Sequence, residues 1–139
     1  MSIVTKHIEL STHGNAESID ITGNIRDALK DTGLSDGVVT VFVPGATGAL
    51  STVEYEPGLI KDMSELWERL VPEGQEYYHD LKWGDGNGHS HLRATLIGPS
   101  LSIPFTGKAL TLGTWQQVIF IDFDVRRRTR RIVLQFMGE

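Results

Sequence analysis

Three of the chain's five histidines lie within thirteen residues, in a segment that also carries two aspartates. If the segment from His89 is a strand, its i, i+2 spacing places His89 and His91 on one face. With His79 alongside, three imidazoles would make a catalytic zinc site whose fourth position stays open. Asp80 and Asp85 would then be ligands or acceptors that orient the histidines. The alternative is a polar loop without a metal.

The predicted strand 89–97 alternates polar and apolar side chains. Its polar face would carry Arg93 one pleat from His91, with the apolar face in the core. A guanidinium beside a metal favours an anionic ligand such as phosphate or carboxylate. The alternative for Arg93 is a solvated residue paired with a neighbouring acid. The preceding glycines, 84–88, lack the Lys-Ser/Thr ending of a P-loop, so they predict a tight turn that delivers Asp85 to the histidines.

Two glutamates form another i, i+2 pair. Glu54 is a candidate general base or oxygen ligand. Glu56 precedes Pro57, a residue typical of a first helical turn, so its favoured role is to stabilise the positive end of that helix.

A predicted turn in the C-terminal half concentrates groups that bind aromatic rings. Thr114, Trp115 and Gln116 combine a hydroxyl, an indole and an amide, which suits a small heterocyclic ligand. Alternatively, Trp115 caps the core or lies in a subunit interface.

The segment 126–131 contains five arginines in six residues. We expect a turn between two strands with most of these side chains solvated, serving ion pairing between subunits or phosphate binding. The run is short and the chain carries a net charge of -5, so a nucleic-acid partner is not expected.

Composition is that of a globular protein: 139 residues, 40% hydrophobic and 22% charged. We predict one domain, 1–139. There is no cysteine, so any metal must be held by nitrogen and oxygen ligands. No signal-peptide pattern or membrane-spanning run is present, and a cytoplasmic location without a membrane partner is the expectation.

Hydrophobic periodicity predicts an α+β layout. One helix is expected from a Thr22 cap to Gly33, and a second from Pro57 to about Leu70. The segment 37–43 predicts a strand buried on both faces. Other strands are expected at 3–10, 49–55, 89–97, 101–105, 109–112, 116–124 and 131–136. Short loops between the late strands predict an antiparallel meander.

Several of these segments together resemble the YjbQ-like family, often labelled secondary thiamine-phosphate synthase. They are Tyr78-His79-Asp80, Asp85-Gly86-Asn87, the run from Ser90 to Leu101, and Leu112-Gly113-Thr114-Trp115-Gln116. The likeness reaches the segment ending in Glu54 and the terminal Gly138-Glu139, so it covers nearly the whole chain.

The resemblance implies a compact antiparallel β-sandwich or barrel with two main helices, assembled as a homotrimer, with a metal site at the histidines. His79 and His91 match family histidines. A third family histidine lies in a His-Thr-Ser-Ala segment, and here Gly45 occupies its place. Our hypothesis is that His89 replaces it as the third ligand of a divalent metal, expected to be zinc. Glu54 matches an acidic position and Arg93 a basic one.

The resulting prediction is a metal-dependent enzyme acting on small phosphorylated molecules. Thiamine-phosphate synthase chemistry, which joins a pyrimidine diphosphate to a thiazole phosphate, is the leading reaction. Glu54 and Asp85 would be catalytic, and Arg93 would neutralise the diphosphate. The alternatives are a metal-dependent hydrolase, with Glu54 or Asp85 as base, and a non-enzymatic module that holds its metal with four protein ligands.

Overall fold

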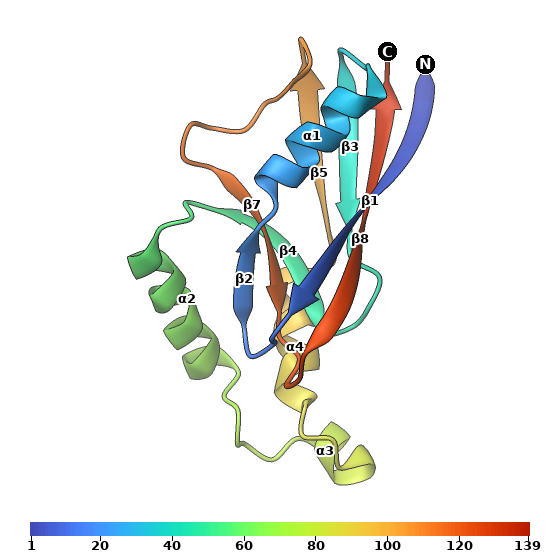
Figure 1. The fold of residues 1–139 in the computed structure, drawn as a ribbon. Coiled ribbons are helices and arrows are strands. Elements are labelled where there is room, and N and C mark those ends of the chain that lie inside the picture. The colour runs from blue at the N-terminus through green and yellow to red at the C-terminus, as the bar shows by residue number, and fades with distance from the viewer.

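Two antiparallel sheets and four helices make up the computed structural model, which describes all 139 residues (Figure 1). The strands are β1 (Ser2–Thr12), β2 (Glu17–Asp20), β3 (Gly37–Phe42), β4 (Gly48–Val53), β5 (Ser100–Thr106), β6 (Ala109–Leu110), β7 (Gln117–Asp122) and β8 (Arg128–Gly138). The helices are α1 (Thr22–Thr32), α2 (Pro57–Leu70), α3 (Tyr78–Trp83) and α4 (Gly88–Ile97). The predicted α+β class and antiparallel pairing are confirmed.

The larger sheet has the order β1-β8-β3-β5-β6. β1 and β8 pair along their whole length, from Ser2 opposite Gly138 to Thr12 opposite Arg128, which brings the two termini together (Figure 1). In β3, Val39 and Val41 are buried and Thr40 is exposed. The prediction that this strand is buried on both faces is therefore wrong, because only one face of the sheet meets the core.

The smaller sheet has the order β2-β7-β4 and is covered on both faces. One face of β7 sends Val118 and Phe120 into the main core of sixteen residues. The other face sends Ile119 and Ile121 into a second core that includes Trp67 of α2 and Ala94 of α4. The predicted meander is wrong, because β7 and β8 belong to different sheets.

Helices α1 and α2 form where the sequence predicts them. Gly33 ends α1 in the left-handed conformation, φ 72°. Thr22 does not cap that helix: its hydroxyl accepts the Val118 N–H, 2.8 Å away, and ties α1 to β7. Glu56 caps α2 as favoured, accepting the Gly58 and Leu59 N–H groups at 2.8 Å, and these hydrogen bonds lower the Glu56 pKa. None of the four helices combines the length and apolar character needed to cross a bilayer.

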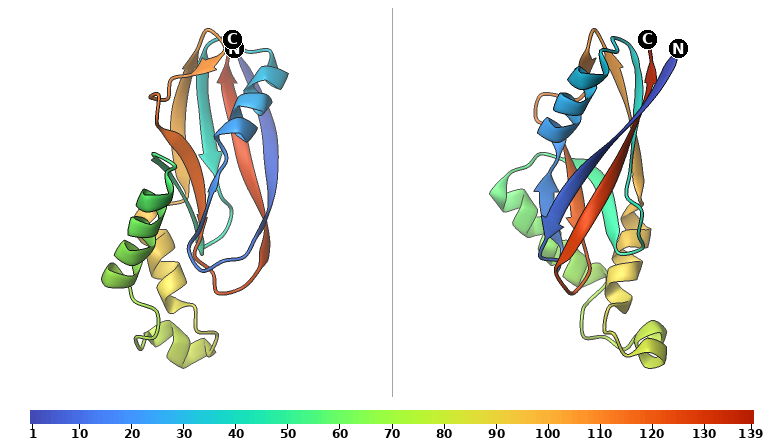
Figure 2. Two further views of the ribbon diagram at one scale, coloured as in Figure 1. Left: turned by 60° about the vertical axis from the view of Figure 1, so that its left-hand side comes forward. Right: turned by 45° about the vertical axis from the view of Figure 1, so that its right-hand side comes forward.

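The predicted strand 89–97 is wrong: these residues form helix α4. Five side chains of α4 recur at helical spacing and face the protein: His89, Ser90, Arg93, Ala94 and Ile97. Leu92 and Leu96, on the opposite side of the helix, are exposed. Polar and apolar residues that alternate over a short run also fit a helix with a buried stripe. The preceding helix α3 was not predicted, and it lies at the end of the molecule away from β6 (Figure 2).

Candidate functional site

The packing of α3 against α4 brings two histidines together. His79 lies in the first turn of α3 and His91 in the first turn of α4. Their ring centroids are 4.6 Å apart, with the ring planes tilted by 45°. The turn between the helices depends on Gly84 and Gly86, which have φ of 71° and 67°. The predicted tight turn is confirmed.

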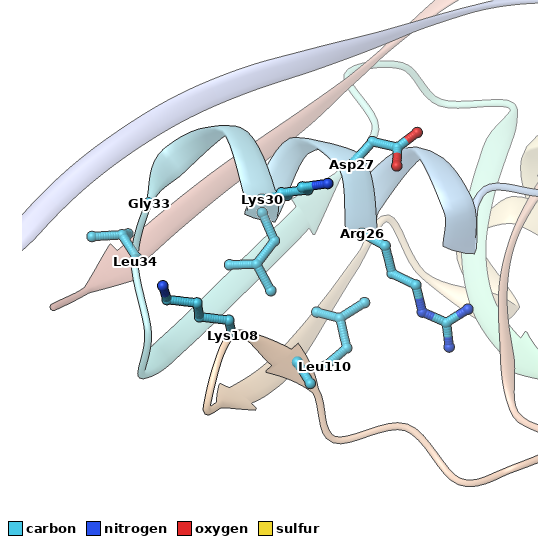
Figure 3. Close-up of a pocket in the computed structure, with 9 residues that line it drawn as sticks. Arg26, Asp27, Lys30, Gly33, Leu34, Lys108 and Leu110 are labelled. Atoms are coloured by element: carbon cyan, nitrogen blue, oxygen red, sulfur yellow. The ribbon is translucent and has the colours of Figure 1, made fainter.

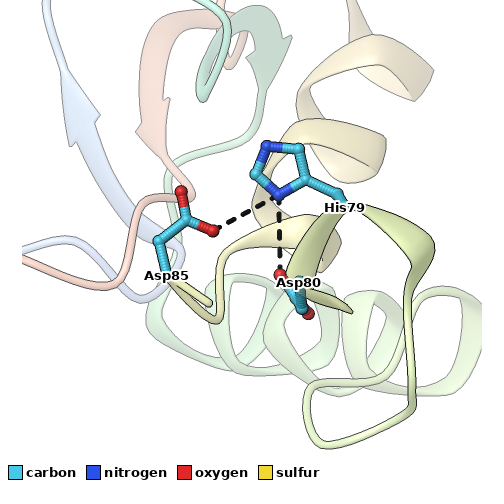
Figure 4. A group of neighbouring side chains, drawn as sticks. All are labelled: His79, Asp80 and Asp85. Atoms are coloured by element: carbon cyan, nitrogen blue, oxygen red, sulfur yellow. Dashed lines mark ion pairs between the residues drawn. The ribbon is translucent and has the colours of Figure 1, made fainter. Parts of the chain in front are cut away.

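Two carboxylates face His79 from its own helix and from this turn (Figure 4). The His79 Nδ1 atom lies 3.6 Å from Asp80 Oδ1 and 3.4 Å from Asp85 Oδ1. Nδ1 is buried and has no hydrogen-bond partner. One ligand atom of each of these three residues lies within 4.8 Å of the others. The arrangement can hold a cation, or it can fix the orientation of the imidazole.

The two aspartates are held differently. Asp80 Oδ1 accepts the Gly88 N–H at 2.8 Å, so it also links α3 to the start of α4. Asp85 lies beside the Asn87 amide, which donates to it at 3.1 and 3.2 Å when its nitrogen faces the carboxylate. Asp85 is the more exposed of the two, and its contacts in the chain are with His79 and Asn87 alone. It is therefore the carboxylate that is freer to respond to a ligand.

His89 is not on the face of His91. Residues i and i+2 of a helix are separated by about 200°, so the face that His89 and His91 would share in the predicted strand does not exist. His89 is only 2% exposed, and Arg93 follows it one turn later on the same side of α4. Burial lowers the His89 pKa, and the charge of Arg93 lowers it further. The structure does not bring His89 into the His79 group.

Arg93 also points away from the pair formed by His79 and His91. Its Nε donates to the Val71 carbonyl at 2.9 Å, and its Nη2 pairs with Glu68 at 3.0 Å. Arg93 therefore joins α4 to α2, which lie side by side (Figure 2). The geometric basis for predicting a guanidinium beside the metal is wrong, because it depended on the strand. Of the alternative, the pairing with a neighbouring acid matches the structure, but the expected solvation does not, because Arg93 is only 5% exposed.

A shallow pocket of about 310 Å³ opens beside His91. One wall comes from α4 and the other from the loop between β3 and β4. Its lining residues are Gly45, Ala46, Gly48, His91, Ala94, Thr95, Gly98 and Pro99. The place where the resemblance implies a family histidine, Gly45, thus borders the same pocket as His91.

The remaining predicted site residues lie at the opposite end of β4. Glu54 follows the last residue of this strand, and the Gln116 amide donates to Thr52 Oγ1 at 3.0 Å. Gly48, at the first residue, borders the histidine pocket. Five steps of about 3.3 Å separate the two ends by about 16 Å. Within one subunit, the structure does not bring Glu54, Thr114, Trp115 and Gln116 to the histidines.

The arginine run supplies one buried and one partly buried ion pair that sequence reasoning missed. Arg130 is 6% exposed, and its Nε and Nη2 both donate to Asp122 at 2.8 Å. Arg128 pairs with Asp124, with 2.6 Å between Nη2 and Oδ2. Burial raises the pKa of both aspartates, but hydrogen bonds and the arginine charges outweigh it and leave each pKa below its usual value. The signal was available, because Arg128 and Arg130 share their strand face with the buried Ile132.

A larger pocket, of about 590 Å³, lies between α1 and the β5–β6 turn (Figure 3). Arg26 and Lys108 stand at opposite ends of it, and Leu110 lies between them. It shares no lining residue with the histidine pocket. It is therefore a separate surface feature.

Similarity to known proteins extends over nearly the whole chain. The sequence model of the family described as UPF0047 protein YjbQ-like matches residues 6–139. A UPF0047 protein of Archaeoglobus fulgidus is 41% identical over 92% of this chain and 97% of its own. A hypothetical protein of Aeropyrum pernix K1 is 35% identical, with a TM-score of 0.91 over 98% of this chain and 99% of its own. A YbjQ-like protein of unknown function from Sulfolobus solfataricus P2 is 26% identical, with a TM-score of 0.89 over 99% of this chain and 100% of its own. The chain belongs to the UPF0047, YjbQ-like protein family.

Proposed function

We propose that this protein is a metal-associated enzyme acting on small phosphorylated molecules, with its metal at His79 and His91. The observation that carries the proposal is the contact of two imidazoles beside two carboxylates, in which the His79 Nδ1 is buried without a hydrogen-bond partner. Such an atom costs free energy unless a proton or a cation engages it. A divalent cation at this cluster would also neutralise the carboxylate charge.

In the arrangement we favour, His79 binds the metal through the ring nitrogen that faces away from the carboxylates, and His91 binds it from the neighbouring ring. In Figure 4 the second ring nitrogen of His79 points away from Asp80 and Asp85. Nδ1–H would then donate a hydrogen bond to a carboxylate, which fixes the tautomer and raises ligand basicity. Two protein ligands leave open positions for water or substrate, and zinc is the metal we expect.

A closed arrangement would use Nδ1 of His79 with Asp80 and Asp85 as ligands. Removing the Asp85 charge separates the two arrangements. If Asp85 only orients His79, Asp85→Asn is expected to weaken metal binding by about 10–100-fold without abolishing it. If Asp85 is a ligand, the substitution should remove the metal.

The first experiment is elemental analysis of the purified protein and its His79→Ala and His91→Ala variants. We expect near-stoichiometric metal in the parent and little in either variant. His13→Ala is the matched control, because His13 is exposed and pairs with Glu17 away from the site. His89→Gln tests the third-ligand hypothesis, and we now expect it to retain the metal. A parent protein without metal after reconstitution would contradict the proposal.

For the reaction, we propose thiamine-phosphate synthase chemistry, with the metal neutralising charge that develops on the diphosphate leaving group. A metal-dependent hydrolase is the second candidate, because open metal positions also activate water. Incubation with hydroxymethylpyrimidine diphosphate and thiazole phosphate separates them. Thiamine phosphate that depends on His91 supports the synthase, whereas diphosphate cleavage without joining supports the hydrolase.

We also propose that the protein is a homotrimer whose active site draws on two subunits. Large apolar side chains stand exposed around the histidines on α3 and α4, where a second copy would cover them. They are Tyr78, Leu81, Trp83, Leu92 and Leu96. A second subunit would also be needed to bring Glu54 and Trp115 to the histidines. Mixed oligomers of His91→Ala and Glu54→Gln subunits should then regain activity, and no recovery would remove Glu54 from the site.

A further inference from the structure

We propose that Arg130 and the loop 45–47 form an oxyanion site beside His91, which takes a phosphate group of the substrate. The inference deepens the proposed function, since it names the protein groups that would hold the phosphorylated part of the ligand. It replaces Arg93, whose guanidinium is already engaged by Glu68 and the Val71 carbonyl.

Two of the three nitrogens of the Arg130 guanidinium have hydrogen-bond partners in the chain. Asp122 accepts from Nε and Nη2, and Thr47 Oγ1 accepts from Nη2 at 2.8 Å. Phe120 lies against the guanidinium, with 5.9 Å between Cζ and the ring centroid. The remaining nitrogen, Nη1, has no acceptor in the chain and faces Gly45. A Cβ atom built on Gly45 would lie 3.2 Å from it. The two N–H donors of Nη1 are therefore free on the side of Gly45, a residue that lines the pocket beside His91.

The loop itself offers more donors. The N–H groups of Gly45, Ala46 and Thr47 donate to no acceptor in the chain. The loop is nevertheless anchored on both sides, because the Val43 N–H donates to the Pro99 carbonyl and the Phe123 N–H donates to the Thr47 carbonyl, both at 2.9 Å. Successive free N–H groups in an anchored turn make a concavity that binds anions.

Charge and backbone conformation around the pocket agree with an anionic ligand. No carboxylate lines the pocket, and the buried Asp122 and Asp124 are each paired with an arginine. Gly45 has φ of 139°, a conformation that other residues rarely adopt, and a side chain in its place would begin only 3.2 Å from Nη1. The α4 wall of the same pocket carries His91, so a bound phosphate would lie next to the proposed metal.

The test is an NMR titration of the metal-free protein with inorganic phosphate. We expect saturable shifts of the Gly45, Ala46 and Thr47 amide signals and of the Arg130 Nε–H signal. Ala46→Asp places a competing carboxylate on this exposed loop and should weaken phosphate binding by about tenfold or more, because like charges repel. Ala46→Asn, a matched neutral variant, should bind within about threefold of the parent, because it adds no charge.

Further variants separate this proposal from the metal proposal. His79→Ala should remove the metal. In the metal-free state, phosphate is expected to shift the Gly45, Ala46 and Thr47 amide signals of this variant as it does those of the parent. Arg130→Lys keeps the charge but loses the second donor arm, and should weaken binding if the variant folds. Equal phosphate binding by Ala46→Asp and Ala46→Asn would overturn the proposal. So would shifts confined to the histidines, binding only when metal is present, or no shift with phosphate in large excess.

Discussion

Two ionic clusters of this protein, one around Asp122 and one around His79, differ in how completely their hydrogen bonds are made. Asp122 and Arg130 meet through two contacts of 2.8 Å, and Thr12 also donates to Asp122, at 2.6 Å. By contrast, the His79 Nδ1 approaches its two carboxylates only to 3.4 and 3.6 Å. A satisfied buried network fixes a scaffold, whereas an unsatisfied one has room for a proton, a metal or a substrate. The Asp122–Arg130 contact therefore belongs to the framework, although Nη1 of Arg130 stays available to a ligand, and the His79 cluster belongs to the candidate site.

The largest effect is expected in the satisfied cluster. Arg130→Met leaves Asp122 as an unpaired buried charge, which should lower the free energy of unfolding by about 3–5 kcal/mol. Urea denaturation measures this, with Arg131→Met as the control, because Arg131 neighbours Arg130 but is exposed. A loss no larger than that of Arg131→Met would show that the network is not the framework.

The unsatisfied cluster should respond in ligand binding more than in stability. We expect Asp85→Asn to weaken zinc affinity by about 10–100-fold, or about 1.4–2.7 kcal/mol, because it removes the acceptor that orients His79. Zinc titration with a competing chelator measures the change. Asp62→Asn on the exposed surface of α2 is the control. A large loss of folding stability in Asp85→Asn, with zinc affinity unchanged, would reverse the roles of the two clusters.

The buried His89 makes folding sensitive to pH. Its pKa lies below the ordinary 6.5, chiefly through burial and then through Arg93, which outweigh the opposing charges of Glu73, Asp80 and Glu68. The unfolded chain therefore binds more protons below pH 6.5, so stability is full above that pH and falls as the pH drops toward the folded pKa. Thermal unfolding between pH 7 and 5 should show a steeper loss for the parent than for His89→Gln. Equal slopes would contradict this account of His89.

The smallest effect concerns Arg93, which the sequence suggested as a ligand-binding group. Its partner Glu68 is 55% exposed, so Glu68→Gln should cost only about 0.2–1 kcal/mol of stability. Phosphate binding should stay unchanged, because Arg93 faces α2. Weaker phosphate binding in this variant would return the anionic ligand to Arg93.

Much of the fold was predictable because local patterns agreed with the final packing. The apolar stripe of α2 and the Glu56 cap are both encoded within a few residues. The neighbourhood of His79, Asp85 and His91 could also be predicted, since these residues lie close along the chain. Helix α4 could not, because its ten residues fit an alternating strand and a helix with a buried stripe equally well.

The remaining errors concern contacts that are distant or depend on that helix. The misassignment of α4 placed His89 and Arg93 on the wrong face. Arg130 looked solvated within a run of arginines, and although it shares a strand face with Ile132, its partner Asp122 lies on β7, in the other sheet. The distance from Glu54 to the histidines depends on the direction of β4, which no local pattern reveals.

X-ray absorption spectroscopy of the zinc-loaded protein tests the central claim most directly, because it counts imidazole ligands. The account predicts two imidazoles at about 2.0–2.1 Å with oxygen completing the shell. His91→Ala should reduce the imidazole contribution, while His89→Gln should leave the spectrum unchanged. Three imidazoles, one of them lost in His89→Gln, would contradict the two-histidine site. They would also mean that α4 is not the helix described above in the metal-bound protein.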